Sequence, residues 1–473
     1  MPLMLNSTLH GRKVEFKPIH EGEVRMYHCG PTVYDYAHIG NFRAFVFSDL
    51  LRRYFEYRGY KVKQVMNITD VGHLTTDADE GEDKILVAMR REGLKDPWEV
   101  ARFYEEKFFE DLDTLDIRRA HHYPRATEMV PEMLECTKKL LEKGNAYEVN
   151  GSVYFDVDTF PEYGKLSGND VARLRAGARL ELNPDKRHPY DFALWKQDPS
   201  HIMKWDSPWG EGFPGWHLEC SVMGTKFLGQ PFDIHTGGED NTFPHHECEI
   251  AQAEAAYDKP FVNYWLHVRH LLVDGEKMSK SRGNFYTLRD LLDQGYDRKA
   301  IRYQLMVSYY GVNQNFTMDG IGAARRSIDR LNQCIRRLKD MRGEVDNPDF
   351  GPLMETARNE FDREMEDDLN VTGAMGKVFE FVTSINKLEL SLSQATEALN
   401  FFREINGILG VLELSDVEVP EEIMEIIQRR EVVRRAKNWA ESDKLRDELK
   451  ELGWAVEDTS TGPVAKRLTH PID

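Results

Sequence analysis

The N-terminal part of the chain alternates short apolar runs with one longer amphipathic segment. Apolar residues gather at positions 24–29 and 62–68 as in buried strands, and a Gly-Pro pair ends the first run. Between these runs, residues 38–59 carry apolar side chains at helical spacing, with Gly59 as a stop signal. Strand, helix and strand within about fifty residues form a βαβ unit, which predicts a parallel sheet with a right-handed crossover.

This pattern is interrupted and then resumes further along the chain. Residues 84–143 have helical periodicity with a break near 121–124, and a strand-rich stretch with many turn residues begins at Ser152. The elements expected after Trp216 are a strand at 232–238, a helix at 247–256 and a strand at 266–273. The middle of the chain is therefore predicted to be an insertion that splits one nucleotide-type α/β fold.

The C-terminal third is predicted to be almost wholly helical. Residues 288–409 keep helical periodicity, with Pro348 and Pro352 marking a hinge. A linker at 415–420 precedes a small terminal unit. Inside that unit, residues 428–450 are predicted to form one basic helix, which is either a solvated amphipathic surface or a local contact for nucleic acid.

Composition narrows the class of protein. The 473 residues are too many for one core, and 41% of them are hydrophobic, as in ordinary globular proteins. No apolar run approaches the roughly 20 residues that span a bilayer, and the N-terminus lacks the apolar region of a signal peptide. Five scattered cysteines do not resemble a disulfide framework, so we expect a cytoplasmic protein that does not contact a membrane. The net charge of −19 argues against general binding of nucleic acid, although it leaves room for a local basic face.

The segment from Gly215 to Ile250 concentrates the residue types that bind transition metals. It holds two cysteines, four histidines and several carboxylates, and His245 and Glu249 are four residues apart, so they share one face of a helix. Cys29, at the end of the first predicted strand, is the obvious candidate for a distant ligand. Two thiolates (Cys29 and Cys220), one imidazole and one carboxylate would make a tetrahedral zinc site.

Two further segments suggest phosphate chemistry. HIGN (His38–Asn41) lies at a strand-to-helix transition, where the helix dipole attracts anions and Gly40 permits a close approach, although a plain helix start is the simpler interpretation. Downstream, KMSKS brings Lys277 and Lys280 into one small polar loop, which could clamp a polyphosphate during displacement at phosphorus. A generic lysine loop is the alternative, but the string is too specific for it.

These motifs together resemble those of class I aminoacyl-tRNA synthetases. Within that class, MYHCGPTVYDYAHIGN, NITDVG, PRATE, DFALWK, PGWHLECS, FPHHExE and DREMEDDLN, in this order, resemble the cysteinyl-tRNA synthetase family over essentially the whole chain. The resemblance implies zinc ligands at Cys29, Cys220, His245 and Glu249, amino-acid contacts at Thr69 and Trp216, signature residues at His38, Gly40, Asn41, Lys277 and Lys280, and an adenosine-facing turn at Gly237, Gly238 and Asp240. His246 is either a pocket histidine or a ligand contact, and Cys248 should face away from the metal.

The resemblance also implies a reaction and its partners. We expect the enzyme to activate L-cysteine with ATP and Mg²⁺, to transfer the cysteinyl group to the terminal adenosine of tRNA(Cys), and to act as a monomer. One zinc ion would bind the substrate as a thiolate, which a serine hydroxyl cannot imitate, so no editing domain is needed. The expected fold is α/β, a Rossmann-type parallel sheet split by a connective insertion and followed by a helical bundle and a small C-terminal domain. The expected domains are 1–120 and 216–270 for the two halves of the catalytic domain, 121–215 for the insertion, 271–330 for the KMSKS loop and stem-contact region, 331–412 for the anticodon-binding bundle, and 413–473 for a small tRNA-binding unit.

Three other functions fit the sequence less well. The cysteine ligase of mycothiol synthesis shares the zinc site but resembles only the catalytic part, and a non-catalytic RNA-binding paralogue should have lost lysines or metal ligands. A dehydrogenase is excluded because no G-x-G-x-x-G follows the first strand. The chain departs from the family at Phe213, where Arg is usual, at Cys248, where Asn is usual, and in its C-terminal sequence, which lacks the common aromatic-Arg ending.

Overall fold

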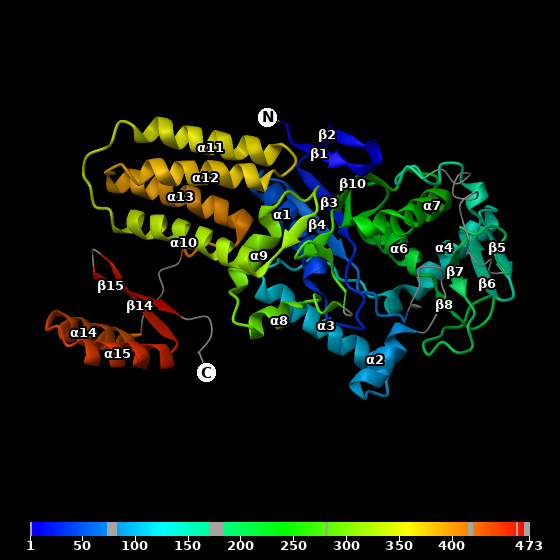
Figure 1. The fold of residues 1–473 in the computed structure, drawn as a ribbon. Coiled ribbons are helices and arrows are strands. Elements are labelled where there is room, and N and C mark those ends of the chain that lie inside the picture. The colour runs from blue at the N-terminus through cyan, green and yellow to red at the C-terminus, as the bar shows by residue number, and fades with distance from the viewer. Residues whose placement is uncertain are drawn as a thin grey trace.

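The N-terminal part of the molecule is built on a four-stranded parallel sheet. The computed structural model describes residues 2–72, 83–169, 184–279, 282–414, 420–459 and 462–467. The sheet has the order β10-β9-β3-β4, and its strands are β3 (Glu23–His28), β4 (Lys61–Met66), β9 (Phe232–Gly238) and β10 (Val262–Val268). The predicted α/β fold with a split parallel sheet is confirmed (Figure 1).

Helix α1 (Ile39–Tyr57) links β3 to β4 and lies at the centre of the molecule. It packs on β4, β9 and β10 and also on helices of the C-terminal half, so every residue from Phe42 to Phe55 is buried. The sequence pattern predicts a helix with one apolar face. The tertiary structure instead covers α1 on nearly all sides, which is why polar residues such as Arg43 and Asp49 are also buried.

The segment between β4 and β9 adds helices and a second sheet, whose buried side chains join the cores around the parallel sheet. Its antiparallel sheet has the order β5-β6-β7-β8, and helices α2 to α4 precede it. The bounds are α2 (Lys84–Glu92), α3 (Pro97–Thr114), α4 (Val130–Glu142), β5 (Ala146–Val149), β6 (Ser152–Phe155), β7 (Phe192–Lys196) and β8 (Phe213–Pro214). Phe213, where the family usually has Arg, stacks on His201 with ring centroids 3.7 Å apart.

The strand predicted at 266–273 is two strands. β10 ends at Val268, and β11 (Leu271–Val273) joins a different sheet with β12 (Glu276–Lys277) and β13 (Gln314–Phe316). The break lies at Arg269 and His270, whose carbonyl groups accept hydrogen bonds from the buried guanidinium of Arg43 at 2.5 and 2.8 Å. A side chain from α1 thus replaces a strand partner at this point, which local sequence does not reveal.

The rest of the chain is helical, as predicted. α8 (Leu288–Asp293) is followed by α9 (Arg298–Val307), which packs on α1. A bundle of four helices comes next: α10 (Met318–Asp340), α11 (Phe350–Glu366), α12 (Val371–Ile385) and α13 (Leu392–Leu409). α10 is continuous through residue 330, where a domain boundary was expected. The expected hinge prolines lie beside the start of α11.

The prediction of a single basic helix at 428–450 is wrong. Two helices, α14 (Glu421–Arg435) and α15 (Trp439–Glu451), pack on each other and on the hairpin of β14 (Trp454–Thr459) and β15 (Gly462–Arg467) (Figure 1). Lys437 has a φ of 57°, and Asn438 caps α15 by accepting a hydrogen bond from the Glu441 N–H group. The chain turns here because the apolar side chains of both helices share one small core, which a single long helix could not enclose.

A short N-terminal hairpin, β1 (Met4–Ser7) with β2 (Arg12–Glu15), packs against β10. Among the helices of the described ranges, none combines the length and the apolar character needed to cross a membrane.

Candidate active site

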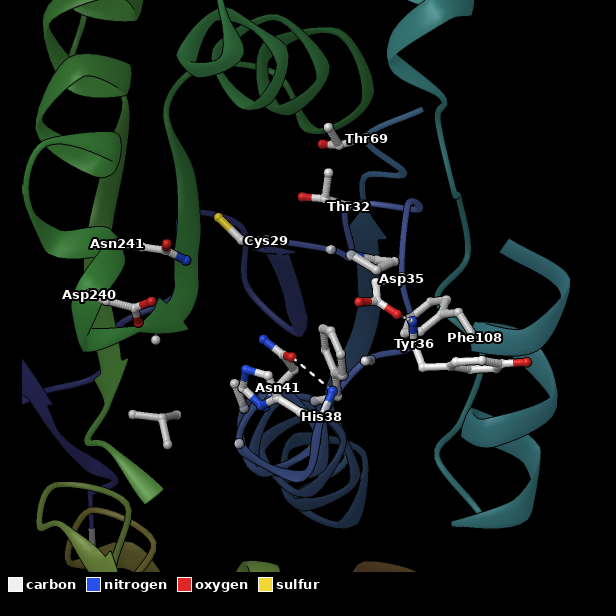
Figure 2. A pocket seen from close by; sticks show the side chains of 18 of the residues that line it. Cys29, Thr32, Asp35, Tyr36, His38, Asn41, Thr69, Phe108, Asp240 and Asn241 are labelled. Carbon is white, nitrogen blue, oxygen red and sulfur yellow. Dashed lines mark hydrogen bonds between the residues drawn. The ribbon is translucent and has the colours of Figure 1, made fainter. Parts of the chain in front are cut away.

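A cleft of about 610 Å³ opens at the carboxyl ends of the parallel strands. Its lining comes from the segments that follow β3, β4, β9 and β10, which meet at this edge of the sheet. In the sheet, β3 has β4 on one side and β9, which comes much later in the chain, on the other. Ligands of open α/β sheets bind where the strand order reverses in this way. Figure 2 shows Cys29, Thr32 and Thr69 at one part of the cleft, and His38 and Asn41 at the N-terminus of α1.

A buried group of metal-binding side chains lies at one end of the cleft. The ligand atoms of Cys29, Cys220, His245 and Glu249 all lie within 4.8 Å of one another. A tetrahedral zinc ion with bonds of about 2.0–2.3 Å separates its ligands by roughly 3–4 Å, so this group needs only small shifts to enclose one. Within the part of the chain that the structure describes, no hydrogen bond of ordinary geometry reaches Glu249 Oε1, although His245 Nε2 lies 3.1 Å away. The donor set and this buried carboxylate oxygen both fit a metal ion.

Neighbouring histidines hold two of these side chains in place. His217 Nδ1 lies 2.7 Å from His245 Nδ1, and His235 Nε2 lies 2.9 Å from Glu249 Oε2. Side chains that bind the outer atoms of ligands in this way fix ring orientation and tautomer in metal sites. α6 (Trp216–Leu228) and α7 (His245–Tyr257) supply three of the four donors, and the predicted helical spacing of His245 and Glu249 is confirmed.

A second group of donors shares Cys29 and Glu249 with the first, and adds His235 and His246. His246, which the sequence leaves as either a pocket histidine or a contact to a bound ligand, has both ring nitrogens in contact: Nδ1 lies 2.7 Å from His267 Nε2, and Nε2 lies 3.1 Å from Cys29 Sγ. The first group is the better metal site because it includes both buried thiols. Cys248 belongs to neither group and contacts the Tyr163 hydroxyl at 3.3 Å, so it faces away from the cluster as predicted.

Burial dominates the electrostatics of this cluster. It raises the pKa of the Cys29 thiol and raises the pKa of Cys220 and Glu249 well above their usual ranges. Burial also lowers the pKa of His235 to about 3. Without a cation the thiols and the carboxyl group therefore hold their protons, and a bound metal would displace them.

The N-terminus of α1 is closed by a reciprocal cap. His38 Nδ1 accepts a hydrogen bond from the Asn41 N–H group at 3.2 Å, and Asn41 Oδ1 accepts one from the His38 N–H group at 3.1 Å. Because Nδ1 is an acceptor, the neutral ring carries its proton on Nε2. The N–H group of Ile39 donates to the Tyr286 carbonyl at 3.0 Å. Because these backbone N–H groups are already hydrogen-bonded, the groups that this terminus presents to the cleft are mainly the imidazole of His38 and the amide side chain of Asn41.

The second predicted signature meets the first. Thr287, which follows the KMSKS segment, pairs with His38 in an isolated antiparallel β-bridge. Met278 of that segment lies against Gly40, where an added Cβ atom would come within 2.7 Å of its methyl group. Lys277 also lines the cleft. Lys280, which we expect to act with it, lies outside the described residues.

A hydrogen-bonded chain runs beneath the expected amino-acid contacts. Asn67 accepts a hydrogen bond from the Gly30 N–H group at 2.8 Å and donates to Thr69 Oγ1 at 3.0 Å; Thr69 in turn donates to Glu219 at 2.5 Å. Burial raises the pKa of Glu219 to about 8. The Trp216 ring packs against His245, with centroids 4.6 Å apart, and Thr69 binds Glu219, the residue before Cys220. Both expected contacts therefore lie near the donor cluster.

Most of the site residues that the sequence predicts line the surface of the cleft, and Gly237 lies in the layer below it. The ones that line the cleft are Cys29, His38, Gly40, Asn41, Thr69, Trp216, Gly238, Asp240, His245 and Lys277. Gly237 lies beneath, where a Cβ atom would come within 2.7 Å of the His246 ring. Asn67 and Glu219 have no role that a local sequence pattern predicts, because only their position in the folded chain connects them with the site. The same holds for Lys84, which also lines the cleft.

A split parallel sheet whose two signature segments meet at one cleft defines a class I aminoacyl-tRNA synthetase. The fold agrees with that of the methionyl-tRNA synthetase of Mycobacterium tuberculosis in complex with methionyl-adenylate, with a TM-score of 0.58, 14% identity, and coverage of 83% of this chain and 88% of that chain. Family models match in three parts: tRNA synthetases class I (C) catalytic domain at residues 15–326, DALR domain at 360–413, and cysteinyl-tRNA ligase anticodon binding domain at 416–462.

Curated relatives match from end to end. The cysteine--tRNA ligase of Chlamydia muridarum is 44% identical over 99% of this chain and 100% of its own length. The cysteine--tRNA ligase of Thermus thermophilus is 45% identical over 98% of this chain and 99% of its own length. The chain belongs to the cysteine--tRNA ligase family.

Proposed function

We propose that the chain activates L-cysteine with ATP and transfers it to tRNA(Cys), and that a zinc ion held by Cys29, Cys220, His245 and Glu249 recognises the substrate thiol. The observation that carries this proposal is the position of the buried donor cluster. It lies at one end of the cleft in which the two signature segments also meet. An amino acid and a nucleotide could thus bind side by side, with the side chain of the amino acid at the metal.

The composition of the donor set supports zinc. Two thiols, one imidazole and one carboxylate in a closed, buried group suit a borderline-soft ion that accepts tetrahedral geometry. When bound there, Zn²⁺ would supply a Lewis acid that ligates a thiolate, which neither serine nor valine can offer.

The protein side chains would then orient the reactants. Thr69 and Trp216 lie beside the donor cluster, where they would hold the amino group and the backbone of the amino acid. Its carboxylate would attack the α-phosphorus of ATP, and pyrophosphate would leave. His38, with a proton on Nε2, would bind phosphate oxygens together with Lys277, Lys280 and Mg²⁺. No protein nucleophile is required, because the carboxylate itself attacks.

The C-terminal half supports tRNA as the acceptor. A helical bundle and a separate small domain follow the catalytic half, and the family models that match there are a DALR domain and an anticodon binding domain. Such an extension has no use in a ligase whose acceptor is a small amino sugar. The cleft also retains the expected side chains, which argues against a non-catalytic paralogue.

The test is charging of total tRNA with labelled cysteine, ATP and Mg²⁺, with serine in parallel. Charging of one tRNA species with cysteine alone is the expected result. Cysteine-dependent pyrophosphate exchange without charging would indicate that the acceptor is a small amine. No activity in the zinc-loaded protein would indicate a non-catalytic RNA-binding paralogue.

A second experiment tests the role of the metal. We expect Cys220→Ser to weaken zinc binding and to reduce discrimination between cysteine and serine in pyrophosphate exchange. Cys136→Ser, at a buried thiol outside the donor groups, is the matched control. If the Cys220 variant keeps its affinity for cysteine and its discrimination, the proposed role of zinc is wrong.

A further inference from the structure

Lys84 brings a positive charge to the amino-acid end of the cleft. It is the first residue of α2, and its ammonium group lies 5.5 Å from the ring centroid of Trp216 and 5.6 Å from that of Tyr34. Both distances are within the range of about 6 Å at which an aromatic face attracts a cation. The side chain lines the cleft together with both rings.

The base of this side chain is firmly held. Asp83 caps α2 by accepting hydrogen bonds from the N–H groups of Ile85 and Leu86, and its other oxygen lies 3.3 Å from His201 Nε2. A cation in the first turn of a helix is unfavourable, because the helix dipole is positive there. Lys84 therefore does not stabilise its own helix through the dipole. Its side chain instead lies beside the Tyr34 and Trp216 rings of the cleft.

Lys84 also lies close to the donor cluster. The Trp216 ring that it contacts packs on His245, and Trp216 is one helical turn before Cys220 on α6. In cysteine only Cβ and Cα separate the thiol from the carboxylate. An amino acid whose thiol reached this cluster would thus hold its carboxylate in the neighbourhood of the lysine.

Two other positive charges line the cleft besides Lys84. Among the cleft-lining residues that the structure describes, Lys84, Arg269 and Lys277 carry permanent positive charge. Arg269 binds Glu239 at 2.5 Å, at the end of β10, and Lys277 belongs to the second signature on β12. Of the three, Lys84 is the one in contact with an expected amino-acid residue.

We propose that the Lys84 ammonium group binds the α-carboxylate of the amino-acid substrate and orients it for attack on ATP. This inference rests on the proposed function, since it takes cysteine as the substrate. It assigns the recognition of the carboxylate to α2, whereas the metal cluster would recognise the thiol. The carboxylate and the thiol of the substrate would then be bound by separate parts of the chain.

The experiment compares two ligands that differ in one charge. L-Cysteinamide has the shape of L-cysteine but a neutral amide in place of the carboxylate. Dissociation constants for both are measured with the zinc-loaded enzyme by tryptophan fluorescence, for the wild type, Lys84→Met, Lys84→Arg and Lys95→Met. Methionine keeps the length and the apolar stem of lysine, and Lys95 is an exposed lysine in the turn after α2, which makes it a matched control.

Lys84→Met should weaken cysteine binding roughly ten- to hundredfold, as expected for the loss of a hydrogen bond between charged groups, and leave cysteinamide binding nearly unchanged. Lys84→Arg should retain most of the affinity, and Lys95→Met all of it. Equal weakening of both ligands would show a packing role against Trp216 and overturn the proposal, as would unchanged cysteine binding. A wild-type enzyme that binds neither ligand and shows no cysteine-dependent pyrophosphate exchange would overturn the proposed function, and this inference with it.

Discussion

His217 offers a sharp test of the metal site, because it acts on a proposed ligand without being one. Its Nδ1 atom lies 2.7 Å from Nδ1 of His245, and both side chains are buried. If His245 binds zinc through Nε2, its proton must be on Nδ1, and His217 must accept that proton in a hydrogen bond. In the metal-free protein, His245 can instead place its proton on Nε2, so the interaction is obligatory only when zinc is bound.

The magnitude follows from the burial of this pair. Replacing His217 with Leu leaves the Nδ1–H group of metal-bound His245 without its acceptor, which costs about 1–3 kcal/mol for a buried donor. Because the cost applies to the metal-bound state, we expect zinc affinity to fall roughly ten- to hundredfold, as is usual for residues that support metal ligands. His217→Asn is the matched control, since its amide oxygen can replace Nδ1 as the acceptor.

The assay is competition for zinc against a chelator of known affinity, with chemical denaturation of the metal-free proteins alongside. We expect zinc affinity to be highest in the wild type, lower in His217→Asn and lowest in His217→Leu. The three metal-free proteins should have similar free energies of unfolding. Equal zinc affinity for Leu and wild type would refute the reasoning. A large loss of stability in the metal-free Leu variant would show that the pair serves the fold instead.

Two further predictions concern the first signature and the pH dependence of stability. Gly40→Ala should change stability only slightly, because a gain in helix propensity of at most about 1 kcal/mol opposes the overlap of the new methyl group with Met278 and His38 at 2.7 and 2.9 Å. Pyrophosphate exchange should nevertheless fall by about tenfold or more, because both displaced side chains line the cleft; unchanged exchange would contradict this. Burial raises the pKa of Asp70 to about 6, so the folded protein holds this proton more tightly than the unfolded chain does. As the pH rises from about 4 to 7, this group alone should reduce the free energy of unfolding by up to about 3 kcal/mol. Asp70→Asn should remove that part of the slope in urea titrations, since its amide oxygen can still accept from the Thr127 N–H group and its NH2 group can donate to Thr127 Oγ1 in place of the present O–H donor. An identical slope would contradict the assignment.

Much of the fold could be predicted from local pattern. The parallel strands, α1 and the long helical C-terminal region follow from periodicity and from glycine and proline stops, which act over a few residues. The errors occur where a distant side chain decides the outcome. The expected strand at 266–273 is broken because Arg43 binds two of its carbonyl groups, and the expected helix at 428–450 is broken because its two halves share one small core.

The candidate site divides in the same way. The sequence by itself determined which chemistry is possible, since the spacing of His245 and Glu249 and the HIGN and KMSKS segments are local features. Only the tertiary structure decided that Cys29 meets Cys220, because these thiols come together where β3 and α6 pack. It also decided which residues support the site: His217 behind His245, Asn67 beneath Thr69, and Lys84 above Trp216. The physical reason is that ligand types and helical spacing are encoded in neighbouring residues, whereas a contact between distant segments depends on the packing of the whole sheet.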